Sequence, residues 1–325
     1  MTSWPLSFDD VLAARARIAP HLSPTPLRSY APLDAAVGRG IRVFVKHENH
    51  LPTNAFKVRN AVSLVTALSD DERRRGVVAA TRGNHGLGLA WAGARFGVPV
   101  TICVPRGNNP EKNAAIVGYG AELLEVGDDY DASAEAAMKV AQDRGMRLAH
   151  STNDLHVLAG AATYALEVVE EEPELDAMVI AVGGGSQAVG ALTVARAKSP
   201  KTAVYGVQAA GASAIHDAWH GAPRGEATAK TFADGLATRG VYELTFDTLR
   251  AGLAGFVTVT ERELSAAVRA LLETTHNLAE GAGAAGLAGL FALRDRLAGK
   301  RVGIVLSGAN IDRATLLRVL DDGFA

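Results

Sequence analysis

The stretch Ala177-Met178-Val179-Ile180-Ala181-Val182-Gly183-Gly184-Gly185-Ser186-Gln187-Ala188 joins a continuously apolar run to three consecutive glycines. Such a run is typical of a strand that is buried on both faces, as in a parallel sheet. The glycines allow a tight turn, and a helix is predicted to follow them. The stretch therefore predicts a strand, a turn and a helix, which together are the repeating unit of an α/β fold.

The same alternation recurs along the whole chain. Further strands are predicted over residues 41–46, 77–80, 98–104, 121–126, 203–207, 255–259 and 302–306. Helical periodicity is found in segments between them, for example over residues 86–96, 130–143 and 155–170. Alternation of this kind predicts parallel sheets covered by helices. No linker composition separates two halves, so we expect two interwoven domains, with ligands bound beyond the carboxyl ends of the strands.

Bulk composition excludes several classes of protein. The 325 residues are 48% hydrophobic and 21% charged, and the formal net charge of −2 gives no basic footprint for nucleic acid. No stretch approaches the ~20 apolar residues that cross a bilayer, and residues 1–10 lack the pattern of a signal peptide. The single cysteine, Cys103, is predicted to be a buried packing thiol. We therefore expect a cytoplasmic protein without nucleic-acid or membrane partners.

The glycine cluster admits three interpretations. It can be a simple turn, or its free amides and the following helix N-terminus can form a nest for a phosphate. Gly183, Gly185 and Ala188 also satisfy the dinucleotide pattern G-x-G-x-x-A, which requires an acid about 20 residues further on. The segment Tyr205-Gly206-Val207-Gln208 contains no acid. A phosphate smaller than a dinucleotide is therefore favoured.

Two further loops follow predicted strands. The loop Thr81-Arg82-Gly83-Asn84-His85-Gly86 precedes a predicted helix, so its amides can bind a carboxylate and Asn84 can bond a phenolic oxygen. Alternatively, Asn84 only caps the helix, and His85 alone is interpreted as structural. In Leu306-Ser307-Gly308-Ala309-Asn310, the Ser307 hydroxyl can bond a pyridine nitrogen in either protonation state, or can cap a helix.

Lys57 lies in Pro52-Thr53-Asn54-Ala55-Phe56-Lys57-Val58-Arg59-Asn60, where a turn leads into a predicted helix. Beside Arg59 it can be an ordinary solvated lysine. It can also be a nucleophile, because a primary amine forms a Schiff base with an aldehyde cofactor and then acts as acid and base. That role requires a partly deprotonated amine, which burial favours. The nearby His47-Glu48-Asn49-His50 lacks the i, i+4 histidine spacing of a metal motif, so no metal site is predicted.

Four motifs stand in a fixed order along the chain. They are Asn-Ala-Phe-Lys at 54–57, Arg-Gly-Asn-His at 82–85, Gly-Gly-Gly-Ser at 183–186 and Ser-Gly-Ala-Asn at 307–310. With this ordered set the chain resembles the fold-type II pyridoxal-phosphate enzymes, and among them the serine/threonine dehydratases. The resemblance implies a tryptophan-synthase-β-like fold and a homodimer. It also implies a large cofactor-binding domain, residues 1–70 with 152–325, and a small domain, residues 71–151.

The resemblance also implies roles for individual residues. Lys57 would form the Schiff base with pyridoxal 5′-phosphate and carry the catalysis. Ser307 would face the ring nitrogen, and Asn84 the 3′ oxygen. The implied cofactor-binding residues are Phe56, Asn84, Gly183, Gly184, Gly185, Ser186, Glu280 and Ser307. The implied substrate-binding residues are Asn54, Thr81, Arg82, Gly83, Asn84 and His85.

The implied reaction converts serine, threonine or a bulkier 3-hydroxy amino acid into a 2-oxo acid and ammonia. Lys57 would remove the α proton, and the β hydroxyl would leave with acid help. A β-replacement enzyme, an amino-acid racemase and a catalytically silent binding protein are the alternatives. Arg82 stands where racemase-like relatives carry a serine, which argues against efficient racemisation. Arg82 can instead pair with an anionic group of the substrate, as in hydroxyaspartate.

Other positions also depart from the family pattern. Asn54, Ser186 and Ala309 stand where glycine is usual, and Asn54 is expected to reshape the substrate pocket. Gln208 lies near the place where the family's divalent-metal site has an acid, so that metal is not expected. The chain ends soon after its last motif, so feedback through a C-terminal regulatory domain is not expected either.

Overall fold

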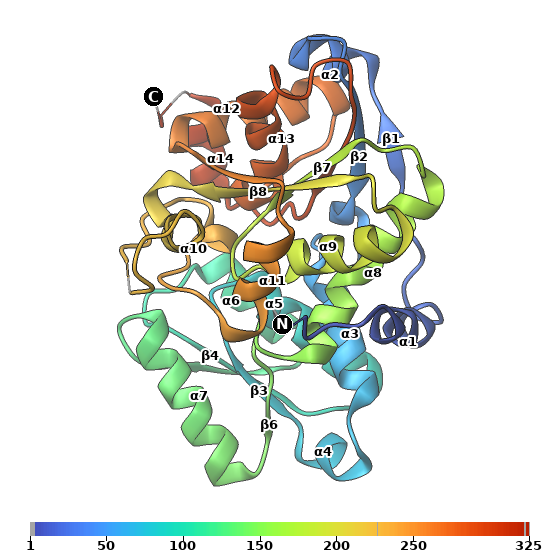
Figure 1. Cartoon of the computed structure of the whole chain (residues 1–325). Helices are drawn as coiled ribbons and strands as arrows, with labels where there is room; N and C mark the ends of the chain where they lie inside the picture. The colour runs from blue at the N-terminus through green and yellow to red at the C-terminus, as the bar shows by residue number, and fades with distance from the viewer. Residues whose placement is uncertain (1–3, 226, 322, 325) are drawn as a thin grey trace.

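The computed structural model describes residues 4–225, 227–321 and 323–324 (Figure 1). Its strands form a six-stranded sheet in the order β1-β2-β10-β7-β8-β9 and a four-stranded sheet in the order β5-β4-β3-β6. β1 pairs antiparallel with β2, and every other strand pairing is parallel. Helices cover both sheets, which confirms the predicted α/β class with open, mainly parallel sheets.

The strands coincide closely with the apolar runs of the sequence. The larger sheet contains β1 (Leu27–Ser29), β2 (Arg42–His47), β7 (Ala177–Ala181), β8 (Ala203–Ala209), β9 (Gly255–Val259) and β10 (Arg301–Leu306). The smaller sheet contains β3 (Val77–Ala80), β4 (Val100–Val104), β5 (Glu122–Glu125) and β6 (Arg147–Leu148). The sequence predicts all of these strands except β1 and β6. Those two are 3 and 2 residues long, too short for a recognisable pattern. Cys103 is buried in β4, as predicted.

Helices occupy the three segments predicted from the sequence, residues 86–96, 130–143 and 155–170, to within about two residues, and they also form in other parts of the chain. They are α1 (Phe8–Ile18), α2 (Ala31–Val37), α3 (Lys57–Ala67), α4 (Asp70–Arg75), α5 (Asn84–Phe96), α6 (Pro110–Gly118), α7 (Tyr130–Arg144), α8 (Leu155–Glu171), α9 (Ser186–Lys198), α10 (Ala214–Trp219), α11 (Glu243–Gly252), α12 (Glu261–Thr275), α13 (Gly281–Leu293) and α14 (Arg313–Leu320). Short 3-10 helices are η1 (Glu48–His50), η2 (Ala210–Ala212) and η3 (Asp234–Leu236). Within the described ranges, no helix combines the length and apolarity that crossing a membrane requires.

Successive side chains of a strand point to opposite faces of the larger sheet, so each face has its own hydrophobic core. Val179 of β7 packs in the cluster that contains the apolar residues of α12 and α13. Its neighbours Met178 and Ile180 pack on the opposite face, with α8 and α9. Figure 1 shows these helix pairs on opposite sides of β7 and β8. A third cluster lies between the smaller sheet and helices α3 and α5.

Helix α3 lies between the two halves of the molecule, and Lys57 is its first residue. It packs against α5 on one side and α8 on the other. A Cβ atom on Gly88 of α5 would lie 2.9 Å from the carbonyl oxygen of Lys57. One on Gly160 of α8 would lie 2.6 Å from the carbonyl oxygen of Arg59. Glycine at both positions therefore lets the two helices approach α3 closely.

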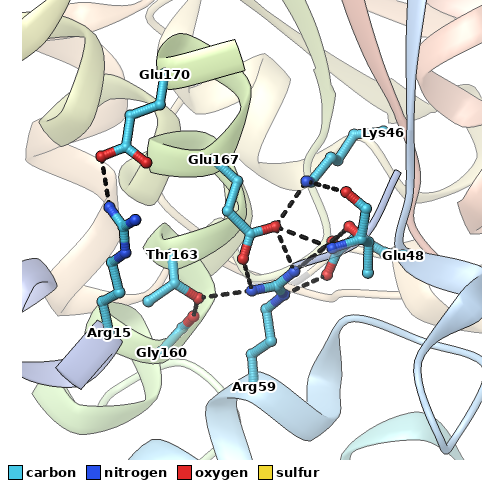
Figure 2. A network of polar contacts seen from close by, with 9 residues as sticks. Arg15, Lys46, Glu48, Arg59, Gly160, Thr163, Glu167 and Glu170 are labelled. Atoms are coloured by element: carbon cyan, nitrogen blue, oxygen red, sulfur yellow. Dashed lines mark hydrogen bonds and ion pairs between the residues drawn. The ribbon is translucent and has the colours of Figure 1, made fainter. Parts of the chain in front are cut away.

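A buried network of charged side chains attaches α3 to β2 and α8 (Figure 2). Arg59 donates from Nε to Glu48 Oε2 at 2.7 Å and from Nη1 to Glu167 Oε1 at 2.6 Å. Lys46 Nζ lies 2.6 Å from Glu167 Oε2 and donates to the Thr25 carbonyl oxygen at 2.6 Å. The Thr25 hydroxyl donates to Glu48 Oε1 at 2.7 Å. Two cations thus meet two carboxylates, so the buried charges balance.

Candidate active site

A cavity of about 690 Å³ is lined by residues from both halves of the molecule. The loops that follow β3, β6, β7 and β10 all contribute to it. Of the residues proposed from the sequence, all but Asn54 line it: Phe56, Lys57, Thr81, Arg82, Gly83, Asn84, His85, Gly183, Gly184, Gly185, Ser186, Glu280 and Ser307. The carboxyl ends of strands from two different sheets therefore meet at one site.

Lys57 contributes its amine to this cavity. Nζ donates to the carbonyl oxygen of Ser151 at 3.4 Å and lies 5.0 Å from the centre of the Phe56 ring. Burial lowers the pKa of Lys57 to about 8, because the ammonium group loses contact with water. At pH 8 roughly half of the amines are thus unprotonated. This environment favours the nucleophile over the solvated lysine.

The glycine loop after β7 forms a cradle at the start of α9. Gly185 is the N-cap of this helix and has a φ of +99°, which suits glycine. A Cβ atom on Gly183 would lie 2.1 Å from the Gly235 carbonyl oxygen, and one on Gly184 would lie 2.1 Å from the Thr152 hydroxyl. Across the described ranges, the amides of residues 183–186 donate to no protein acceptor. Free amides at a helix N-terminus fit a phosphate group.

Asn84 is fixed from two sides. Its Nδ2 donates to Glu280 Oε1 at 2.6 Å, and its Oδ1 accepts from Asn310 Nδ2 at 2.7 Å. Gly83, not Asn84, is the N-cap of α5, so the simple capping interpretation is wrong. Burial raises the pKa of Glu280, while Lys112 and the Asn84 hydrogen bond act against the rise. Asn310, which has no role assigned from the sequence, is signalled there by its place in the last motif.

At Ser307 the last sequence motif, residues 307–310, contacts the first one, residues 54–57. Ser307 is buried directly after β10, and its hydroxyl donates to the Ala282 carbonyl oxygen at 3.4 Å. Its own carbonyl oxygen accepts from the Phe56 amide at 3.0 Å. An isolated antiparallel bridge joins the next residue, Gly308, to Ala55. The end of β10 therefore positions the residues that precede Lys57.

The loop after β3 presents the N-terminus of α5 to the cavity. The Thr81 hydroxyl accepts from the Gly83 amide at 3.1 Å, which shapes the turn. His85 Nε2 lies 2.9 Å from the Ala149 carbonyl oxygen, so this nitrogen carries the proton. Burial and the charge of Lys57 lower the pKa of His85 to about 3. The ring is thus neutral, and the first amides of α5 can hold a carboxylate.

Asn54 lies outside the cavity lining. Its φ is +52°, a left-handed conformation that glycine and asparagine adopt most readily. Its side chain is exposed and donates to Asn310 Oδ1 at 3.4 Å, and its carbonyl oxygen accepts from the Ala309 amide at 2.9 Å. Asparagine in place of the family's glycine therefore preserves the backbone conformation of this turn.

Several polar cavity residues have no signal in the sequence motifs, among them Tyr130, His150 and Tyr242. Tyr130 is the first residue of α7, His150 follows β6, and Tyr242 precedes α11. None of them belongs to a glycine-rich loop or an ordered motif, and only the fold brings them to the cavity. The carbonyl group of Ser151, which accepts from Lys57, is equally invisible in a side-chain pattern.

Comparisons with known proteins agree with this geometry. The family described as "Pyridoxal-phosphate dependent enzyme" matches residues 18–308. L-threonine ammonia-lyase of Thermotoga maritima is 36% identical over 285 residues, which cover 87% of this chain and 71% of the relative. L-threo-3-hydroxyaspartate ammonia-lyase of Saccharomyces cerevisiae is 33% identical over 321 residues, 98% of each chain. The crystal structure of a pyridoxal 5′-phosphate-dependent aspartate racemase matches with a TM-score of 0.91 and 28% identity, covering 97% of this chain and 99% of the other.

The site fits the cofactor of that family. The glycine cradle offers free amides for a phosphate, and Lys57 offers an amine of lowered pKa for an aldehyde. Pyridoxal 5′-phosphate is therefore the cofactor of this protein. The chain belongs to the pyridoxal-phosphate dependent enzymes of fold type II and is related to the threonine and serine dehydratases and to hydroxyaspartate ammonia-lyase.

Proposed function

We propose that this enzyme is an ammonia-lyase that converts a 3-hydroxy amino acid, such as serine, threonine or a bulkier analogue, into a 2-oxo acid and ammonia. The observation that carries the proposal is the Lys57 amine of lowered pKa, which shares one cavity with the glycine cradle and Ser307. Two relatives at 36% and 33% identity, an L-threonine and an L-threo-3-hydroxyaspartate ammonia-lyase, support it.

The residues of the chain divide the work as follows. The amides of residues 183–186 would hold the phosphate, Asn84 would bond the 3′ oxygen, and the Ser307 hydroxyl would bond the ring nitrogen. The bound cofactor withdraws electrons from the α carbon of the substrate and so makes its proton acidic. Lys57 would hold the cofactor through its amine, and Nζ would accept the α proton of the substrate. The first amides of α5 bind the α-carboxylate of the substrate.

The elimination is favoured over its alternatives by two side chains. Ser307 offers a neutral hydroxyl where a carboxylate would keep the ring nitrogen protonated, and this favours loss of a group from the β carbon. Racemisation needs an acid–base group on the face of the substrate opposite Lys57. Arg82 lies on the loop where racemase-like relatives carry a serine for that purpose, and a guanidinium does not give up its proton near neutral pH.

The test combines spectroscopy with product analysis. Protein loaded with pyridoxal phosphate should absorb in the visible and release 2-oxo acid and ammonia from 3-hydroxy amino acids. Lys57→Ala should lose the activity by ~10²–10⁴-fold or more. Equal activity in Lys57→Ala would exclude Lys57 from the mechanism. A thioether product in the presence of a thiol would indicate β-replacement, and a colourless protein would indicate a silent binding protein.

We also infer how the chain is organised. We assign residues 71–151 to a small domain and residues 1–70 with 152–325 to a large one, because the four-stranded sheet lies within residues 77–148. Residues 1–3, 226, 322 and 325 within these bounds lie outside the described part of the chain. A cytoplasmic homodimer is inferred from the family resemblance and the lone buried thiol. Limited proteolysis tests the domain bounds, and light scattering tests for a particle of twice the chain's mass.

A further inference from the structure

The cationic side chains that line the cavity differ in whether they form an ion pair with a carboxylate. Most are paired: Lys112 with Asp234, Arg239 with Asp131, and Arg224 with Asp247. Lys57 donates to a backbone carbonyl group and is reserved for the cofactor. Arg82 is exposed and has no carboxylate partner in residues 4–225, 227–321 and 323–324. A guanidinium left without a partner inside a binding cavity is available to an anionic ligand.

Two tyrosines lie in the same part of the cavity. Burial raises the pKa of Tyr130 and Asp131 adds to the rise, while a hydrogen bond with the Ser151 side chain and, less strongly, the charge of Arg82 act against it. Burial raises the pKa of Tyr242 to about 12, with a further contribution from Tyr130. Tyr130, Tyr242 and Arg82 all line this one cavity. Both phenols stay protonated at neutral pH, so each can donate a hydrogen bond.

His150 adds a neutral donor beside Tyr242. Its Nδ1 accepts from the amides of Thr152 at 3.0 Å and Asn153 at 2.8 Å, so the proton of the ring is on Nε2. Burial and the charge of Lys57 lower the pKa of His150, which keeps the ring neutral. Its ring centre lies 5.7 Å from that of Tyr242, in an edge-on arrangement. The Nε2–H group has no acceptor among the described residues.

The four side chains Arg82, Tyr130, His150 and Tyr242, here called the donor cluster, offer a cation and three neutral donors. A carboxylate is the group that such a set recognises, because it accepts hydrogen bonds through both oxygens. The α-carboxylate has its own place at the first amides of α5. Asp131 also lines this region, but its charge is met by Arg239. The donor cluster therefore has hydrogen-bond donors and a positive charge available for a second carboxylate.

We propose that the side chain of the substrate carries this second carboxylate, so that the substrate is a 3-hydroxy amino dicarboxylic acid of the 3-hydroxyaspartate class. The inference rests on the proposed function and narrows its substrate. The α C–H and β C–O bonds break, and the hydroxyl group leaves with a proton as water. The resulting enamine gains a proton at the β carbon while its nitrogen loses one, which gives an imine. Water then adds at the α carbon and ammonia leaves, which gives a 2-oxo dicarboxylic acid. No oxidant or reductant is needed.

The experiment compares kcat and KM for 3-hydroxyaspartate stereoisomers, serine and threonine in the wild-type holoenzyme, in Arg82→Met and in Arg82→Lys. The wild type should prefer a 3-hydroxyaspartate. Arg82→Met should lower kcat/KM for that substrate ~10- to 100-fold, mainly through KM, because it removes a charged hydrogen bond. It should change the values for serine and threonine much less. Arg82→Lys should recover part of the loss.

Arg95→Met is the matched control, since Arg95 is an exposed arginine of α5 outside the cavity lining. It should leave all substrates unaffected. A second measurement does not depend on turnover. Succinate should bind the wild-type holoenzyme in calorimetry and bind Arg82→Met at least ~10-fold more weakly. The visible absorbance of each variant shows that the cofactor site is intact.

The outcomes separate this inference from the proposed function. Equal losses for serine and 3-hydroxyaspartate in Arg82→Met would place Arg82 at the α-carboxylate and overturn the inference alone. A wild-type preference for serine or threonine over every 3-hydroxyaspartate would also overturn it while supporting the ammonia-lyase. Absence of 2-oxo acid from all of these substrates would overturn both.

Discussion

Arg59 and Arg82 have opposite surroundings, although Arg59 shares helix α3 with Lys57 and Arg82 lines the same cavity as Lys57. Arg59 is 1% exposed, and its guanidinium is met by Glu48 and Glu167, whereas Arg82 is exposed and has no carboxylate partner in the described part of the chain. In the buried network around Arg59, cations and carboxylates balance, so nothing remains to bind a ligand. In the donor cluster around Arg82, donors exceed acceptors. The difference separates an arginine that holds a helix in place from one that recognises a substrate.

The largest effect should appear when each arginine is replaced by methionine. Arg59→Met leaves two buried carboxylates with less compensation and should lower the free energy of unfolding by ~3–5 kcal/mol. Arg82→Met should change it by less than about 0.5 kcal/mol, because no contact with a carboxylate is lost. Urea denaturation of both variants measures the difference. Similar losses of stability in the two variants would break the comparison. If Arg59→Met does not fold, that result already exceeds the expected loss for Arg82→Met.

A smaller difference in unfolding free energy is expected between Glu167 of the buried network and Glu280 of the cavity. Burial opposes ionisation of Glu167, but Arg59 and Lys46 hold its pKa below the ordinary value, whereas burial raises the pKa of Glu280. Glu167→Gln removes a charge that two cations need and should cost ~2–3 kcal/mol of unfolding free energy. Glu280→Gln replaces a carboxyl group whose charge is disfavoured by burial and should cost less than about 1 kcal/mol. Thermal unfolding at neutral pH compares the two variants.

Glu167 and Glu280 also differ in the sign of their effect on stability as pH changes. Because the pKa of Glu167 is lower in the folded state, its contribution is present above the ordinary carboxyl pKa and is lost as pH falls through the folded pKa. Because the pKa of Glu280 is raised, its charge destabilises the fold above that pKa, and stability is regained as pH falls. Glu167→Gln should therefore flatten the acid limb of the stability profile. An unchanged acid limb would show that Glu167 is not held in its charged form.

The smallest effect concerns Lys57, which shares helix α3 with Arg59 and the cavity lining with Arg82. Its pKa of about 8 means that the unprotonated fraction rises as pH increases through that value. The rate at which cofactor-free protein captures pyridoxal phosphate should thus rise about tenfold between pH 7 and 9 and then level off. Stopped-flow absorbance measures this rate. A rate that keeps rising tenfold per pH unit up to pH 10 would mean that the amine is not shielded from water.

Much of this fold was accessible from the sequence because parallel strands are continuously apolar and their loops carry the glycines. β1 and β6 were missed because they are short, and β1 is an antiparallel strand whose residues are mostly exposed. The site residues in loops that follow strands could be predicted because each apolar strand marks where its loop begins. Tyr130, His150 and Tyr242 were not, because only the packing of distant elements brings them together.

Arg59 and Asn54 show a second limit of sequence patterns. Next to Lys57, Arg59 suggested a solvated surface, yet its partner Glu167 is 108 positions away in the chain. Such a pairing leaves no local pattern. Asn54 was expected to reshape the pocket, whereas the structure places its side chain outside the cavity lining and gives it a left-handed backbone. The residue type at position 54 is explained by a dihedral angle, which a one-letter pattern does not contain.

The close approach of α5 and α8 to α3 has a consequence for the mutations that can silence this enzyme. Gly88 and Gly160 face the first turn of α3, where a methyl group on either would collide with a backbone carbonyl group. Relief of that collision would shift the start of the helix, and a misplacement of ~1 Å at a reacting group can cost ~10²-fold in rate. An inherited alanine at either site would thus act as a loss-of-function allele. It would leave every group that touches cofactor or substrate chemically unaltered.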